Sequence, residues 1–200
     1  MTQIRVGGVY GVGKTTIIER SLEVLATDRD VQIPKIKGSA IMAKILGIPP
    51  DLLPEQPEGS RKLAREMMYE EISRMPDGVR DAHFAVVTER GGYEFPRSNV
   101  DRFCVGALVV ITADAETIAI RRAAVGRVYR STDLDDIRQH QQIEAEAAAR
   151  LANELGVPCY TIDNSAETPE AAVNLLNDII LEHSDSTAVA RTVESRINIT

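Results

Sequence analysis

The sequence GGVYGVGKTT, at residues 7–16, decides the fold of this chain. Its residues 8–15 match the pattern GxxxxGK[ST] at every fixed position. The apolar run IRVGG (4–8) comes before the match, and the helical pattern TTIIERSLEVLA (15–26) follows it. A glycine-rich turn between a strand and a helix is typical of a loop that surrounds phosphate groups.

Each residue type in this loop has a physical task. Glycine permits the backbone angles and close approach at which amide N–H groups point inward to phosphate oxygens. Lys14 would place a cation on the outer phosphates, and the Thr15 hydroxyl would join the oxygen shell of Mg²⁺. The residues predicted to hold a nucleoside triphosphate are Gly8, Gly11, Val12, Gly13, Lys14, Thr15 and Thr16.

Short apolar runs alternate with helical patterns along the rest of the chain. The predicted strands are 4–8, 31–36, 84–89, 106–114 and 157–163. Continuous apolar strands that alternate with helices indicate an α/β fold with a parallel sheet covered on both faces. We expect a single domain over 1–183 and a polar C-terminal tail over 184–200.

The composition limits the partners. The chain has 200 residues and a formal net charge of −7 at pH 7, which opposes binding to nucleic-acid backbones and anionic lipids. No apolar run is long enough for a signal peptide or a membrane span. We therefore expect a cytoplasmic protein without nucleic-acid or membrane partners, with Cys104 and Cys159 reduced and buried in strands.

Arginines gather after the predicted strand 106–114. They lie in the sequence IRRAAVGRVYRSTD at positions 121, 122, 127 and 130. The planar guanidinium meets phosphate oxygens in pairs, and positive charge on a migrating phosphoryl group favours its transfer. The segment at about 124–136 is therefore predicted to be a short arginine lid, with Arg127 and Arg130 as catalytic residues and Arg121 at the nucleotide.

The sequence FAVVTERGGYEFPR (84–97) offers an acid at a strand end. Glu89 is predicted to hold Mg²⁺ through water or to act as a base toward an attacking hydroxyl. Arg90, the next residue, would contact the acceptor of the phosphate.

At the level of its motifs, the chain resembles the archaeal-type adenylate kinases, which are small P-loop nucleoside-monophosphate kinases. The matching segments are GGVYGVGKTTI, KIKGSAIMAKIL, SRKLAREMMYEEISRM and the stretch from IRRAAVGRVYRSTD to HQ at 140–141. The resemblance implies a doubly wound core with strand order 2-3-1-4-5. It also implies ATP as donor, Mg²⁺ as helper, a monophosphate as acceptor, lid roles for Arg127 and Arg130, and an oligomer.

The leading prediction is transfer of the ATP γ-phosphate to a nucleoside monophosphate, most of all AMP. The acceptor region would span about 35–75, and its predicted contacts are Ser39, Arg61, Lys62 and Arg90. One alternative is a kinase of a nucleoside or another small-molecule hydroxyl, with Glu89 as base. A second alternative, of a different class, is a nucleotide-binding regulatory ATPase.

Overall fold

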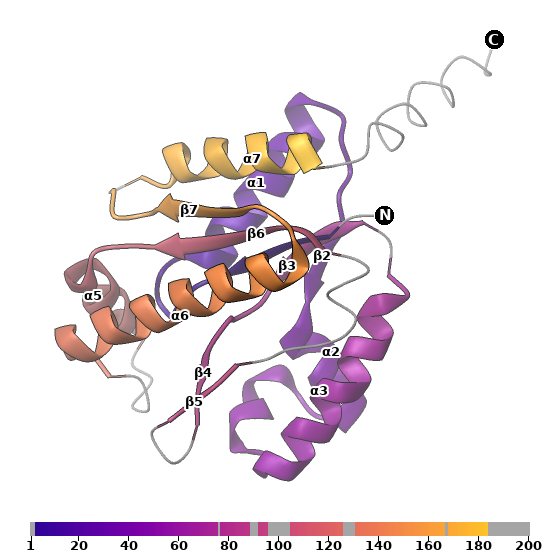
Figure 1. Ribbon diagram of the computed structural model, residues 1–200, viewed down its shortest axis with the longest axis vertical. Coiled ribbons are helices and arrows are strands. Elements are labelled where there is room, and N and C mark those ends of the chain that lie inside the picture. The colour runs from indigo at the N-terminus through magenta and orange to yellow at the C-terminus, as the bar shows by residue number, and fades with distance from the viewer. Residues whose placement is uncertain are drawn as a thin grey trace.

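The computed structural model describes residues 3–75, 77–88, 92–95, 105–125, 131–166 and 168–183. Figure 1 shows the arrangement. The strands are β1 (Gln3–Gly7), β2 (Lys35–Lys37), β3 (Gly78–Asp81), β4 (Val86–Val87), β5 (Tyr93–Glu94), β6 (Val105–Thr112) and β7 (Cys159–Asp163). The helices are α1 (Lys14–Asp28), α2 (Gly38–Leu46), the 3₁₀ helix η1 (Pro50–Glu55), α3 (Glu58–Ser73), α5 (Ala115–Val125), α6 (Leu134–Leu155) and α7 (Glu170–His183).

A five-stranded parallel sheet forms the centre of the fold. Its strand order is β2-β3-β1-β6-β7, which is the predicted order 2-3-1-4-5 when the sheet strands are counted along the chain. The α/β fold class and the topology are therefore confirmed. The chain leaves β1 toward β2 on one side and leaves β3 toward β6 on the other side of β1, so the connections diverge between the neighbouring strands β1 and β3. Ligands of open α/β sheets bind at such a point, beyond the carboxyl ends of the strands.

The third strand of the sheet is not the predicted one. β3 is the four-residue segment Gly78–Asp81, which pairs with both β1 and β2. The segment predicted as that strand, 84–89, instead contains β4, which pairs antiparallel with β5 in a separate hairpin. The apolar run was misleading because β3 carries Arg80 and Asp81, whose charges broke the continuous apolar pattern of a buried strand.

Helices cover both faces of the sheet, as Figure 1 shows for α1 and α7 on one side and α6 on the other. Val109 and Ile111 of β6 pack into the core beneath α1 and α7. Leu108 and Val110, which alternate with them, pack against α6. Because both faces of β6 are buried, the strand is apolar throughout, and this explains why its sequence was easy to recognise.

A third apolar cluster holds α2, η1 and α3 together at one end of the sheet. Its centre is formed by Met42, Leu53, Met68 and Ile72, and it reaches the sheet at Ile36 of β2. This lobe corresponds to the predicted acceptor region, 35–75. Figure 1 shows the β4–β5 hairpin extending from the sheet beside the lobe.

Two further expectations can be compared with the fold. Cys159 is exposed, not buried, because it lies on β7, a strand at the edge of the sheet. Cys104 is outside the described residues, as are 126–130 of the predicted lid and the predicted tail. Among the described helices, none is long and apolar enough to cross a membrane.

Candidate active site

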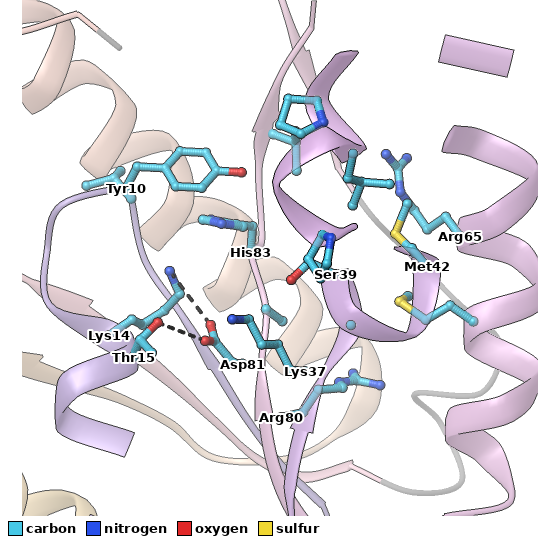
Figure 2. A pocket seen from close by; sticks show the side chains of 18 of the residues that line it. Tyr10, Lys14, Thr15, Lys37, Ser39, Met42, Arg65, Arg80, Asp81 and His83 are labelled. Atoms are coloured by element: carbon cyan, nitrogen blue, oxygen red, sulfur yellow. Dashed lines mark hydrogen bonds and ion pairs between the residues drawn. The ribbon is translucent and has the colours of Figure 1, made fainter. Parts of the chain in front are cut away.

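A cavity of about 790 Å³ opens at the carboxyl ends of the sheet strands. The loop that follows β1 forms one half of its wall, and β2, α2, η1 and α3 form the other. Asp81, Ala82 and His83, which follow one another at the end of β3, also line it. Figure 2 shows Lys14 and Thr15 on one side of this cavity and Met42 and Arg65 on the other.

The phosphate loop has the backbone geometry that its sequence predicts. Gly13 has a φ of 95°, in the left-handed region that side chains rarely adopt. A Cβ atom at this position would lie 2.4 Å from Nδ2 of Asn164. Glycine is therefore required here both by the backbone angle and by the space, and it lets helix α1 begin directly at Lys14.

Lys14 and Thr15 meet an acid that the sequence analysis did not select. The Thr15 hydroxyl donates to Oδ2 of Asp81 over 3.1 Å. Nζ of Lys14 lies 3.9 Å from Oδ1 of the same carboxylate and donates to the Gly8 carbonyl over 3.0 Å. Asp81 ends β3 beside β1, which is the position that had been predicted for Glu89.

The phosphate loop is braced from behind by three polar side chains. Arg121 donates to the carbonyls of Val12 and Asn164, over 3.1 and 3.2 Å. Arg122 donates to the Tyr10 carbonyl over 2.9 Å, and Asn164 donates to the Val12 carbonyl over 2.7 Å. Three of these four bonds give hydrogen-bond partners to the loop carbonyls of Tyr10 and Val12 and hold the loop in place.

Basic side chains line the half of the cavity that β2, α2, η1 and α3 form. Lys37 ends β2, Arg61 and Arg65 lie on α3, and Arg80 lies on β3. Arg65 pairs with Glu94 of the hairpin, which ties α3 to β5. The excess of cations over carboxylates in this half favours an anionic ligand.

A His–Glu pair stands at the junction of the two halves. His83 keeps 19% of its side chain exposed, and its Nδ1 lies 3.0 Å from Oε1 of Glu144 on α6. Burial, with the charge of Lys14, lowers the pKa of His83. Burial alone would raise the pKa of Glu144, but the hydrogen bonds from His83 and the Phe84 amide hold it below its ordinary value.

The predicted site residues fare differently in the structure. Gly11, Gly13, Lys14, Thr15, Thr16, Arg121, Ser39 and Arg61 all line the cavity. Gly8 and Val12 are buried in the loop, whereas Lys62 is exposed and is not among the lining residues. Glu89, Arg90, Arg127 and Arg130 lie outside the described residues, so their roles stay predictions.

Sequence reasoning missed Lys37, Arg65, Arg80, Asp81 and His83. Arg65 lies one helical turn beyond Arg61, so the spacing of the α3 arginines would have found it. Asp81 and His83 could have been predicted only with the position of the end of β3.

Comparison with known proteins finds similar solved structures. No family model and no curated protein matches this sequence. The YorR protein from Bacillus subtilis, solved in complex with phosphorylated GDP, is 17% identical with a TM-score of 0.57, over 91% of this chain and 98% of its own. A shikimate kinase from Acinetobacter baumannii in complex with shikimate is 15% identical with a TM-score of 0.53, over 92% and 96%.

A gluconokinase from Sinorhizobium meliloti is 14% identical with a TM-score of 0.51, and the match covers 92% of this chain and 97% of that one. The chain shares its fold with small P-loop kinases. At these identities the likeness concerns the fold alone. The finer resemblance to archaeal-type adenylate kinases remains a prediction.

Proposed function

We propose that this protein is an ATP-dependent kinase of a small anionic acceptor, and that the acceptor is a nucleoside monophosphate such as AMP. One observation carries the proposal: a single cavity joins the phosphate loop to a half lined by Lys37, Arg61, Arg65 and Arg80. We call the side of the phosphate loop the donor half and the side of these basic residues the acceptor half. A donor phosphate and an acceptor anion bound in them would meet in the middle of the cavity.

The donor half fits a triphosphate with Mg²⁺. Gly13 has the positive φ with which this loop turns into α1, and Lys14 begins that helix, whose N-terminus attracts anions. The Thr15 hydroxyl and the Asp81 carboxylate adjoin, and both are the oxygen ligands that Mg²⁺ prefers. When bound there, Mg²⁺ would neutralise charge on the outer phosphates, with waters and phosphate oxygens completing its shell.

The acceptor half combines cations with apolar walls. Met42, Leu53, Met68 and Ile72 line it beside the basic side chains. Apolar walls suit the faces of a nucleobase, and the cations suit its phosphate. An oxygen of that phosphate would bond to the γ-phosphorus while the bond from this phosphorus to the β–γ bridging oxygen breaks, which releases ADP.

A phosphate acceptor is already a nucleophile, so the chain's own residues need only hold and align the two substrates. Lys14 would stabilise the charge on the migrating group. Arg127 and Arg130 are proposed to close over it, and Arg121 to brace the nucleotide loop, as it does through the Val12 carbonyl.

The fold neighbours favour a second candidate. They include kinases named for shikimate and gluconate, and such hydroxy acids also carry an anion that the basic half would bind. A hydroxyl acceptor must lose its proton during transfer. Glu89 is the predicted base. Among the described residues, Asp81 and His83 line the junction of the two halves and could also accept this proton.

The test is ADP release from Mg-ATP with purified protein. The acceptors would be AMP and the other nucleoside monophosphates, the free nucleosides, shikimate, gluconate and water alone. Lys14→Ala provides the blank for contaminating kinases. We expect one monophosphate to stimulate ADP release well above water.

Stimulation by a hydroxy acid or nucleoside only would replace the leading acceptor with the second candidate. ATP binding without stimulation by any acceptor would instead favour a nucleotide-binding regulatory ATPase and would overturn the proposed kinase activity.

A further inference from the structure

Glu144 is a charged residue on the buried face of α6. It is 0% exposed; on that face the alanines Ala147, Ala148 and Ala152 follow it, and the buried His140 lies one helical turn before it. A buried carboxylate costs free energy of desolvation, and an apolar side chain would pack α6 against the sheet without that cost. Packing of α6 against the sheet therefore does not explain why this position carries a glutamate.

The two carboxylate oxygens bind three consecutive residues. Oε1 lies 3.0 Å from Nδ1 of His83, and Oε2 accepts from the amides of Phe84 and Ala85 over 2.6 and 3.0 Å. Only Ala82 separates these residues from the end of β3, where Asp81 meets Thr15. Glu144 thus reaches across 61 positions of sequence to hold the segment that follows Asp81.

Arg5 of β1 holds the same segment from the side of the sheet. Its Nη2 donates to the His83 carbonyl over 2.6 Å, and its guanidinium lies 4.8 Å from the centre of the Phe84 ring. The backbone of the segment is therefore held by β1 and α6 together, whereas the hydrogen bond that orients the His83 ring comes from Glu144.

The pairing determines how the His83 ring is oriented. An ionised carboxylate can only accept hydrogen bonds, so Nδ1 of His83 must carry the hydrogen. In the neutral ring, Nε2 is then an acceptor. The ring centre lies 4.5 Å from that of Tyr10 in the phosphate loop, and Figure 2 shows His83 between Tyr10 and Ser39 of α2.

We propose that Glu144 is a positioning residue for phosphoryl transfer, which holds the His83 ring at the junction of the donor and acceptor halves with Nε2 as a hydrogen-bond acceptor. His83 would touch the bound substrates, and Glu144 would act only through it. This inference rests on the kinase activity proposed above. Glu144 lies in a helix far from the phosphate loop in the sequence and belongs to no motif, so the sequence alone does not predict this role.

The first test is a spectroscopic one that needs no substrate. Nitrogen-15 NMR of the imidazoles at pH 8 reports which ring nitrogen carries the hydrogen, and His83→Gln assigns the His83 signals among three histidines. We expect the Nδ1–H form in the wild type. In Glu144→Gln, two amide donors keep the Gln oxygen in place, so its NH₂ faces Nδ1 and the ring switches to the Nε2–H form. A wild-type ring in the Nε2–H form, or no switch in the variant, would overturn the proposal.

The second test is kinetic and uses the acceptor that the ADP-release assay selects. Glu144→Gln should lower kcat by about 10- to 100-fold, as is typical when the partner of a functional group is removed. The KM for ATP should stay unchanged. Glu146→Gln, on the exposed side of the same helix, is the matched control and should behave as wild type.

A double-mutant cycle separates positioning from simple destabilisation. If Glu144 acts through His83, Glu144→Gln should cost nothing further in a His83→Ala background. Equal losses in both backgrounds would mean that Glu144 is only structural and would overturn the inference while leaving the kinase activity intact. Absence of turnover in the wild type with every acceptor would overturn the proposed function and this catalytic role with it.

Discussion

The two halves of the cavity are built in opposite ways. The donor half comes mainly from one continuous stretch, residues 8–15, closed by a single carboxylate from β3. The acceptor half is assembled from β2, α2, η1, α3 and β3, and its cations come from three of these elements. A continuous loop leaves a motif in the sequence, whereas an assembled surface does not. The predictions below test whether the halves also act separately.

The largest effect is expected for Lys14→Ala. Removing a preorganised cation from the transferring group should lower turnover by at least about 10²- to 10³-fold. The exposed Lys44→Ala, on α2, is the control for loss of a positive charge. The measurement is kcat with the identified acceptor, and wild-type turnover by Lys14→Ala would exclude the donor half as the nucleotide site.

Asp81→Asn should lower turnover by roughly 10²-fold, because a neutral amide is a poor partner for Mg²⁺. The variant should also lose much of the dependence of ATP binding on Mg²⁺, measured by calorimetry with and without the metal. The same measurements on Glu89→Gln show whether Asp81 or the predicted Glu89 is the main acid of the donor half. A larger loss in Glu89→Gln than in Asp81→Asn would show that Asp81 is not the main acid of the donor half.

Gly13→Ala should strain the phosphate loop of the donor half. A side chain at a φ of 95°, 2.4 Å from Asn164, should lower the free energy of unfolding by about 1–3 kcal/mol and weaken ATP binding. Gly59→Ala, where a Cβ atom meets nothing within 4 Å, is the matched control. Denaturant unfolding measures the difference, and equal stabilities of the two variants would contradict the strained geometry.

The smallest effect is expected in the acceptor half. Arg65→Ala should raise the KM for the acceptor about tenfold, which corresponds to about 1.4 kcal/mol, because the other cations remain. The KM for ATP should not change. Arg74→Ala, at the exposed end of α3, is the control. An equal rise in both KM values would break the distinction between the two halves.

The sequence predicted the loop between β1 and α1, but not that Asp81 meets it. Residues 8–15 form their loop through local backbone preferences and end at a helix, so a short motif suffices. Asp81 was missed because β3 is four residues long and half charged, and its burial depends on β1 and β2 pairing with it from distant parts of the chain. The apolar run after it was then taken as the strand, and Glu89 as the acid.

In the acceptor half, helical position made the difference between Arg61 and Lys62. Both lie in the first turns of α3, but neighbouring residues on a helix point about 100° apart, so Arg61 lines the cavity and Lys62 is exposed. Which face of α3 is buried was decided by the cluster around Met68 and Ile72.

By itself, the sequence determined the phosphate loop, the alternation of strands and helices and thus the α/β class, because these depend on local geometry and on apolar periodicity. Only the tertiary structure decided that Asp81 closes the donor half, that Lys37 and Arg65 line the acceptor half, and that Glu144 is buried against His83. Each of these depends on contacts between elements far apart in the chain, and a charged side chain does not reveal from its own position which partner will meet it.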